Sequence, residues 1–266
     1  MNNSKILIIL INIFIINICF CLEKTTFNII TFNIHGYGKI LSGCNVKKNI
    51  NQIIDEISNY DIIFIQENWK YNNLIIDQLF NHQLIFGNNK KNKISFSSGL
   101  VIGINRNFEI INYDEITYND CNGILLNGSD CFASKGFIFS RIKIDDQILD
   151  IYNTHMDAGN SLKDKNIRSK QLISFEKFII ENSTNHNLII CGDFNIDYYN
   201  SSQIHQFQNN LDLQVVKWND NYFLDKKIDY IFYRIMFPYE ISTDEIPNIL
   251  YTLSDHPPLT LSLKAR

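Results

Sequence analysis

Six short polar motifs in this chain could carry chemistry, and each adjoins a run of apolar residues. Continuous apolar runs are typical of buried strands, and polar residues at one end of several such strands converge where the sheet meets solvent. Carboxylates, amides and imidazoles without a cysteine cluster suit a hard divalent cation. The pattern favours metal-assisted hydrolysis of a phosphoester. The motif residues are Asn33, Glu67, His155, Asp193 with Asn195, Asp229, and Asp255 with His256.

The expected metal ligands follow from the charge of a phosphoester, whose attack by water requires neutralisation. Glu67 is the expected direct ligand because a carboxylate at a strand end supplies hard oxygens, and Asn33 adds an amide oxygen. Asp255 is a further candidate ligand. Asp193 and Asn195 alternate on an extended segment and face one side, where they would position water and a phosphoryl oxygen or hold a second ion. Mg2+ is the expected cofactor, with Mn2+ or another divalent cation as the alternative.

The expected general base is His256, because an imidazole with an ordinary pKa near 6.5 can take a proton from water at neutral pH. Asp229 would orient that imidazole, as a carboxylate orients histidine in hydrolytic triads. His155 would donate a hydrogen bond to a non-bridging phosphoryl oxygen. The remaining histidines are predicted to be ordinary loop residues, the first of them with least support because it follows Asn33 by two positions: His35, His82, His186 and His205.

Two cationic residues leave alternatives open. Arg168 shares a helix face with Leu172 and Phe175, and a buried guanidinium requires an anion. A structural ion pair behind the His155 strand, with Asp157 as a candidate partner, is favoured over contact with substrate. Lys135 is equally consistent with a cation at the rim of the phosphate site and with a solvated strand residue.

The N-terminal residues have the layout of a signal peptide. Lys5 precedes an apolar stretch that runs to Phe20, and Cys19 and Cys21 supply small residues before a cleavage point at Leu22. Residues 1–21 are therefore predicted to be removed and the protein to be secreted; an uncleaved membrane anchor is the alternative. Removal takes away Lys5 and no acidic residue, so the net charge falls from −4 to −5. This mild acidity provides no basic footprint for tight nucleic-acid binding.

Cysteines and glycosylation sequons fit an exported protein. Cys121 and Cys131 flank a loop rich in Gly and Asn and are predicted to form a disulfide, whereas Cys191 lies in an apolar run and is predicted to be a buried thiol. The fourth cysteine outside the leader is Cys44. Outside the leader, three Asn-x-Ser/Thr sequons indicate surface sites, although an Asn-rich chain also produces them by chance: Asn127, Asn182 and Asn200.

The apolar periodicity predicts an α/β protein in which two mixed sheets pack face to face with helices outside. Strand runs without helices imply antiparallel pairs, and strand–helix–strand units imply parallel pairs. Helices are predicted over residues 46–58, 73–80, 162–182 and 201–209. Strands are predicted over residues 27–33, 61–66, 84–86, 99–104, 108–113, 136–144, 148–153, 187–192, 213–218, 228–234 and 259–263.

Taken in order, the motifs resemble those of the endonuclease/exonuclease/phosphatase superfamily. The resemblance extends from Phe27 to Leu263. It implies a four-layer sandwich, one catalytic domain over residues 22–266, and divalent-metal hydrolysis of a phosphodiester or phosphomonoester. The segments that carry it are Asn33, Gln66-Glu67, Asn153-Thr154-His155, Gly192-Asp193-Phe194-Asn195, Ile228-Asp229-Tyr230 and Ser254-Asp255-His256.

Within the superfamily, the chain is most similar to secreted sphingomyelinase-type phosphodiesterases. Two segments carry this similarity: Ala133-Ser134-Lys135-Gly136-Phe137, and the series from His155 to Arg168 and Gln171. Within the second segment, Met156-Asp157 departs from the residues that are commoner in those enzymes. The similarity implies a phospholipid substrate at a membrane surface. A secreted Mg2+-dependent nuclease acting on nucleic acid is the alternative, and a non-catalytic binding module on the same scaffold is a third.

Two aromatic stretches are candidates for choosing the substrate. Trp218, Tyr222 and Phe223 lie upstream of Asp229 and could form a wall of the site, and the segment from Ile235 to Tyr239 could face lipid. Packing in the core is the commoner use of such residues and is the favoured interpretation for both.

Overall fold

The computed structural model describes residues 26–36, 46–88, 97–123, 131–219, 227–236 and 239–265. The predicted leader, Cys44, Asn127, Tyr222 and Phe223 lie outside these ranges. Among the helices that are described, none combines the length and the apolar character needed to cross a membrane.

The first sheet has six strands around one parallel pair. β1 and β2 run parallel and are joined by helix α3, and every other neighbouring pair is antiparallel. The strand order is β11-β12-β1-β2-β4-β3. The elements are β1 Thr26–Asn33, α3 Val46–Ile57, β2 Ile62–Gln66, α4 Asn72–Gln78, β3 His82–Phe86, β4 Val101–Asn105, β11 Tyr239–Ser242 and β12 Leu259–Ala265.

The second sheet repeats this plan. β7 and β8 run parallel and are joined by the long helix α5, again among antiparallel neighbours, in the order β5-β6-β7-β8-β10-β9. Short 3-10 helices lie at Tyr198–Asn200 and Asn248–Thr252. The elements are β5 Glu109–Thr117, β6 Gly136–Ile144, β7 Gln147–His155, α5 Leu162–Ser183, β8 Asn187–Asp193, α6 Ser202–Asn210, β9 Gln214–Val215 and β10 Asp229–Arg234.

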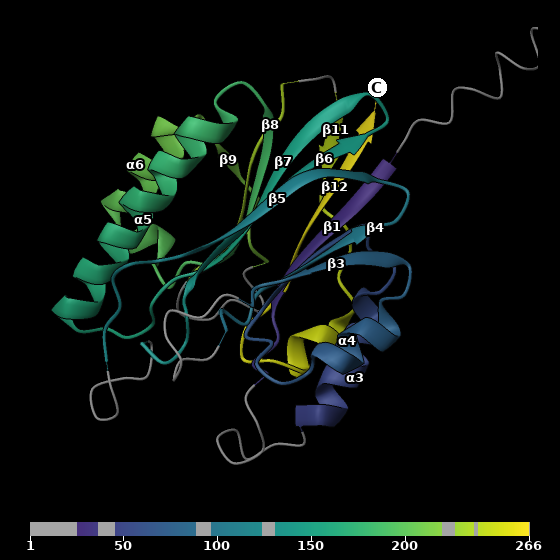
Figure 1. The fold of residues 1–266 in the computed structure, drawn as a ribbon, viewed down its shortest axis with the longest axis horizontal. Helices are drawn as coiled ribbons and strands as arrows, with labels where there is room; N and C mark the ends of the chain where they lie inside the picture. The colour runs from purple at the N-terminus through teal and green to yellow at the C-terminus, as the bar shows by residue number, and fades with distance from the viewer. Residues whose placement is uncertain are drawn as a thin grey trace, which may run out of the picture.

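The predicted four layers are two sheets and a pair of helices on each outer face, and three apolar clusters fill the spaces between them. One lies between the sheets, where Phe64 meets Ile151 and Ile189, a second packs α5 and α6 against the second sheet, and a third packs α3 and α4 against the first. Figure 1 shows the two helix pairs on opposite flanks of the strands. The predicted apolar face of α3 is confirmed, because its four isoleucines are fully buried: Ile50, Ile53, Ile54 and Ile57.

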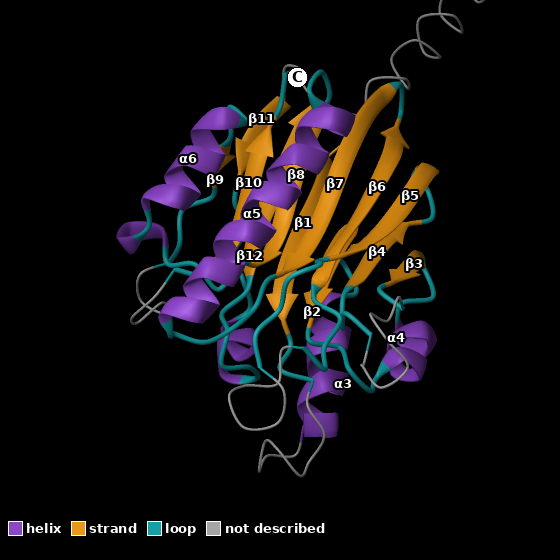
Figure 2. Cartoon of the chain, turned by 60° about the vertical axis from the view of Figure 1, so that its left-hand side comes forward, coloured by secondary structure: helices purple, strands orange, loops and turns teal. Residues whose placement is uncertain are grey.

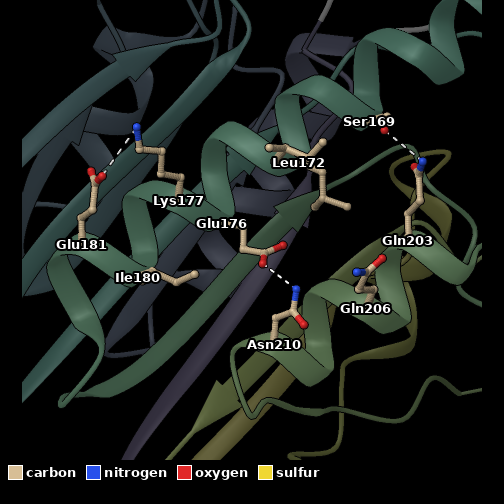
Figure 3. Close-up of a pocket in the computed structure, with 10 residues that line it drawn as sticks. Ser169, Leu172, Glu176, Lys177, Ile180, Glu181, Gln203, Gln206 and Asn210 are labelled. Atoms are coloured by element: carbon tan, nitrogen blue, oxygen red, sulfur yellow. Dashed lines mark hydrogen bonds and ion pairs between the residues drawn. The ribbon is translucent and has the colours of Figure 1, made fainter.

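Helices α5 and α6 are held side by side by polar pairs on their outer surface (Figure 3). The Gln203 amide donates to Ser169 Oγ at 2.9 Å, and the Asn210 amide donates to Glu176 Oε1 at 2.7 Å. Beneath them Leu172 and Phe175 are buried against the sheet. A capping box at Ser161 fixes the start of α5.

A buried amide bridge joins the two sheets. Gln66 Nε2 at the end of β2 donates to Asn153 Oδ1 on β7 at 2.7 Å and to Thr31 Oγ1 at 3.1 Å. Asn153 Nδ2 donates in turn to the carbonyl oxygens of Ile65 and Val101, both at 2.9 Å. All these groups lie inside the sandwich, so the bridge sets how one sheet sits on the other.

Ile235 and Tyr239 pack against the apolar cluster between the sheets, as the favoured core interpretation of this segment predicted. Other expectations differ from the structure. His205 is not a loop residue, because it lies within α6. Predicted strand 213–218 is reduced to Gln214–Val215. His82 is not a loop residue: it begins β3, is buried, and pairs through Nε2 with Tyr60 O at 2.7 Å.

Candidate active site

The polar motifs meet at one edge because both parallel pairs end there. Asn33 on β1 pairs with Gln66 on β2, and His155 on β7 pairs with Asp193 on β8, which also opposes Asp229 on antiparallel β10. The loops that follow lie together below the strands in Figure 2. Asn33 Nδ2 donates to Asp193 Oδ2 at 3.1 Å, so a hydrogen bond across the two sheets closes the site.

Glu67 has the surroundings of a cation ligand. Its side chain is 10% exposed, Oε1 lies 3.8 Å from His155 Nε2, and the buried Oε2 has no hydrogen-bond partner. Burial raises the pKa of this carboxyl, although the nearby Lys135 opposes the rise. The backbone at Glu67 has a φ of 62°, a left-handed conformation that costs free energy for a non-glycine residue. These features fit a carboxylate that is completed by a bound positive charge.

Asp193 and Asn195 form a rigid turn at the end of β8. Asn195 N donates to Asp193 Oδ1 at 2.9 Å, and Asn195 Nδ2 donates to the carbonyl oxygen of Met156 at 3.1 Å. Asn195 also has a left-handed backbone, with a φ of 53°. The two side chains are therefore fixed before any substrate arrives, as their predicted positioning role requires.

His256 and Asp229 form the predicted imidazole–carboxylate pair. Nδ1 of His256 lies 2.8 Å from Asp229 Oδ2, and its Nε2 lies 3.9 Å from Asp193 Oδ2. Burial lowers the pKa of His256, but the carboxylates of Asp229 and Asp193 outweigh it and raise the pKa well above the ordinary value. Trp218 Nε1 donates to the carbonyl oxygen of Asp229 at 2.9 Å, so this tryptophan holds the strand rather than lining an open wall.

Lys135 is part of the site, which decides the alternative that the sequence left open. Its side chain is buried, and Nζ lies 2.5 Å from His155 Nε2. Because an ammonium can only donate, Nε2 accepts this hydrogen bond, and the ring proton belongs on Nδ1. Burial, Lys135 and His256 together lower the pKa of His155 well below its ordinary value, so His155 is neutral.

His35 was predicted to be an ordinary loop residue, and this prediction is wrong. Its Nδ1 lies 3.1 Å from Asp255 Oδ1 and 3.8 Å from Glu67 Oε2, and its backbone has a φ of 47°. Asp255, with its side chain 60% exposed, thus reaches the site through His35. The only sequence signal was the position of His35 two residues after Asn33, whose Oδ1 accepts from His35 N at 3.1 Å.

A clamp behind His155 accounts for Arg168 and the disulfide. Arg168 Nη1 donates to the carbonyl oxygens of Asp157 at 2.9 Å and Gly159 at 2.8 Å. The Asp157 carboxylate is fully buried and accepts from Gln171 Nε2 at 2.8 Å and Asn122 N at 2.7 Å. The predicted bond between Cys121 and Cys131 is present, and Cys191 is a buried free thiol as predicted. The clamp ties the segment before Lys135 to α5.

The donor groups fit one or two divalent cations. Ligand atoms of Glu67, His155 and Asp193 lie within 4.8 Å of one another, and so do those of Asp193, Asp229 and His256. Buried carboxylate oxygens without partners are costly unless a positive charge approaches them, and Glu67 Oε2 and Asp229 Oδ1 are both of this kind. Oxygen and imidazole donors are compatible with Mg2+ or Mn2+.

Comparison with known protein families shows to which of them the chain belongs. The model of the Endonuclease/Exonuclease/phosphatase family matches residues 30–256. The chain belongs to this family. The match includes every motif residue from Asn33 to His256, so the resemblance inferred from the motifs is confirmed.

Individual members of the family are similar over shorter stretches or in fold. Sphingomyelinase C of Bacillus cereus is 30% identical over 80 residues, which cover 28% of this chain and about a quarter (24%) of the sphingomyelinase. A variant of beta toxin from Staphylococcus aureus, solved with bound magnesium ions, has a TM-score of 0.67 at 16% identity and covers 91% of this chain and 100% of its own. The human Nocturnin catalytic domain with bound sulfate has a TM-score of 0.64 at 17% identity, covering 91% and 96%. The TM-scores of these two structures establish a shared fold, and their identities are too low to establish more than the fold.

Two sequon asparagines can be placed on this family fold. Asn182 near the end of α5 and Asn200 in the first 3-10 helix are both exposed. Their exposure is compatible with the predicted glycosylation and does not establish it.

Proposed function

We propose that this chain is a secreted, divalent-cation-dependent phosphodiesterase that removes the phosphorylated head group of a phospholipid, as a phospholipase C does. The observation that carries the proposal is the convergence of Glu67, Asp193 and the His256–Asp229 pair at one sheet edge. The lipid substrate is supported by the sequence match to sphingomyelinase C. Export is supported by the predicted leader and by the disulfide between Cys121 and Cys131.

The proposed cofactor is Mg2+, with Mn2+ as the alternative. Glu67 and Asn33 would hold one ion with Asp255 nearby, and Asp193 with Asn195 would hold a second. A bound ion would neutralise negative charge on the phosphoryl group.

His256 supplies the general base in this proposal. Beside a bound cation, the raised pKa of His256 would fall and its Nε2 would be freed of its proton. Nε2 then takes a proton from the attacking water, whose oxygen forms the new bond to phosphorus while the bond to the lipid alcohol breaks. Asp229 accepts the Nδ1–H bond, which keeps Nε2 directed at the water and stabilises the imidazolium that forms. The departing alcohol receives a proton from solvent or from His256.

Lys135 is proposed to bind a phosphoryl oxygen, and His155 to position the Lys135 ammonium. The Lys135 ammonium already donates to His155 Nε2, and a phosphoryl oxygen entering between them would accept from the same cation. His155 stays neutral and positions that ammonium. The direct donation from His155 that the sequence suggested is thereby reassigned to Lys135.

Parallel assays on purified protein test the proposal. Vesicles containing sphingomyelin or other phospholipids, and plasmid DNA, are offered with Mg2+ or with excess EDTA, and the His256→Ala variant is the control. The expected result is release of phosphorylated head group that requires both Mg2+ and His256. Cleavage of DNA alone would favour a nuclease, and inertness towards every substrate would favour a binding module.

A further inference from the structure

A cavity of about 410 Å³ adjoins the site on the side of α5. The first turns of α5 form one wall, and the segment that follows β8 forms the other. Asn195 belongs to this lining as well as to the catalytic cluster, so a group held in the cavity lies beside a phosphate bound at Asn195. Its lining includes Lys165, Arg168, Asn195, Asn200, Ser202 and Gln203.

The charges of the lining favour hydroxylated or anionic groups. Arg168 is 5% exposed and fixed by the carbonyl oxygens of Asp157 and Gly159, and Lys165 extends from the exposed side of α5. The single carboxylate, Asp197, accepts from Lys227 N at 3.1 Å and from the Asn200 amide, so both of its oxygens are engaged. The lining therefore carries two cations against one carboxylate, while the side-chain amides of Asn195, Asn200 and Gln203 donate within the protein.

The same lining is poorly suited to choline. A quaternary ammonium is bound by aromatic faces, and the described residues that line this cavity include no aromatic ring. Two exposed apolar or amphipathic side chains lie close in the chain to residues of the lining. Leu162, one helical turn before Asn166, is 80% exposed, and Tyr199, next to Asn200, is 66% exposed. Such residues suit contact with a bilayer surface around a polar opening.

We propose that this cavity is the head-group subsite, and that it takes a phospholipid head group carrying several hydroxyls or a second anionic group in preference to a quaternary ammonium. The inference rests on the proposed phospholipase activity and specifies its substrate class. Lys165 contributes an exposed cation, and Arg168 and Asn195 form the side that is held by hydrogen bonds within the protein.

Lipid selectivity provides the first test. Wild type is offered phosphatidylinositol or sphingomyelin in vesicles of otherwise identical composition, together with Lys165→Glu and with Lys163→Glu as the matched control on the exposed surface of the same helix. Wild type should prefer phosphatidylinositol, and Lys165→Glu should lower the ratio of the two kcat/KM values at least about tenfold, whereas Lys163→Glu keeps it. An equal fall in both variants would indicate vesicle charge alone and would overturn the subsite.

Soluble head groups provide a second test that needs no membrane. Inositol 1-phosphate and phosphocholine are compared as inhibitors of the hydrolysis of bis(p-nitrophenyl) phosphate by the Mg2+-loaded protein. Inositol 1-phosphate should inhibit at least about tenfold more tightly, and Lys165→Glu should remove that advantage. Equal inhibition by the two compounds overturns the subsite even where lipid is hydrolysed. Hydrolysis of DNA without any lipid hydrolysis overturns the proposed function, and the subsite with it.

Discussion

Buried charges gather at both ends of the second sheet, and the two groups are built in opposite ways. Asp150 lies near the start of β7 and His155 at its end, about 16 Å apart at roughly 3.3 Å per residue. Around Asp150 both carboxylate oxygens are paired, and among the described residues of this cluster Arg234 Nε is the one buried side-chain polar atom without a hydrogen-bond partner. Around His155 and Glu67, several of the buried polar atoms have no partner.

The Asp150 carboxylate is saturated with hydrogen-bond partners. Arg141 binds both carboxylate oxygens, at 2.7 and 2.8 Å, and Ser183 Oγ and His186 Nδ1 lie 2.5 and 2.8 Å from the same group. Arg234 donates to the carbonyl oxygens of Ser183 and His186. These contacts satisfy the end of α5 and attach it to the sheet. His186, predicted to be an ordinary loop residue, is a member of this structural cluster.

The active-site cluster is unsaturated and strained. Glu67 Oε2, Asp229 Oδ1 and His155 Nδ1 are buried without hydrogen-bond partners, and three non-glycine residues of the site have left-handed backbones: His35, Glu67 and Asn195. Buried charged and polar residues therefore stabilise the fold where they hydrogen-bond to one another. They serve binding where their polar atoms remain without partners and can contact a ligand. Removing a charge should thus have opposite consequences at the two ends.

The largest expected effect comes from Glu67→Gln. The variant keeps the shape of the side chain and removes the charge that would hold the cation, so kcat/KM should fall about 1,000-fold, equivalent to about 4 kcal/mol, and the apparent Mg2+ affinity should fall with it. Because the carboxylate is buried with an unpartnered oxygen, the melting temperature measured in EDTA should not fall. Undiminished activity of this variant, or of wild type in excess EDTA, would contradict the metal mechanism.

Asp150→Asn should show the reverse behaviour. It leaves the partly buried Arg141 guanidinium without its counter-charge, so the free energy of unfolding should fall by about 3 kcal/mol. Activity per folded molecule should stay near wild type because Asp150 lies far from the motifs. Urea denaturation and assays at a temperature where the variant is folded provide the two measurements. A stable but inactive variant would refute the division of roles between the two ends.

The disulfide is a stabilising device at the active-site end itself. Replacing Cys121 and Cys131 by serine should lower the free energy of unfolding by about 2 to 3 kcal/mol, the loop-closure entropy of a short loop. Peptide mapping without reduction should first find the two cysteines linked. Two free thiols in secreted protein would reject the pairing, and Cys191→Ser is a control that leaves the disulfide intact.

The smallest expected effect is on the number of protons released when Mg2+ binds, which should change by a fraction of a proton. The neighbouring carboxylates raise the pKa of His256 above its ordinary value, so the cation-free enzyme binds this proton at pH 8. A bound cation disfavours the imidazolium and lowers that pKa, so Mg2+ binding should release protons, and Asp229→Asn should reduce the release because its His256 is already largely neutral. Calorimetry in buffers of different ionisation enthalpy measures the number. Binding of Mg2+ to wild type without proton release would argue against this coupling.

The sequence predicted the interior strands and the site edge because both follow from apolar runs and their ends. β2 and β8 are buried at every position, and their terminal polar residues could only lie at a sheet edge. By contrast, β11 is largely exposed and carries no such run, so its residues contain no signal for a strand. β5 extends beyond its predicted end at Tyr113 to Thr117, through one exposed and three half-buried residues, because its pairing with β6 continues there.

Residues whose roles depend on distant partners were beyond prediction. Arg141 and Asp150 face each other across β6 and β7, but sequence periodicity does not reveal that Ser183 and His186 complete the cluster. Lys135 reaches the site because the register of β6 against β7 pairs the neighbouring Gly136 with His155. His35 reaches it because its backbone is left-handed. The motif residues were identifiable, whereas the groups that complete or constrain them were not.

The amide bridge between Gln66 and Asn153 has a mechanical consequence. Apolar side chains between two sheets resist separation but allow small sliding, because their attraction has no preferred direction. Hydrogen bonds are directional, so sliding by even one ångström would break the bonds from Asn153 to Ile65 and Val101. Glu67 belongs to one sheet and Asp193 to the other. The bridge therefore sets the gap between the two carboxylates, and with it the spacing of the two ions that they would hold.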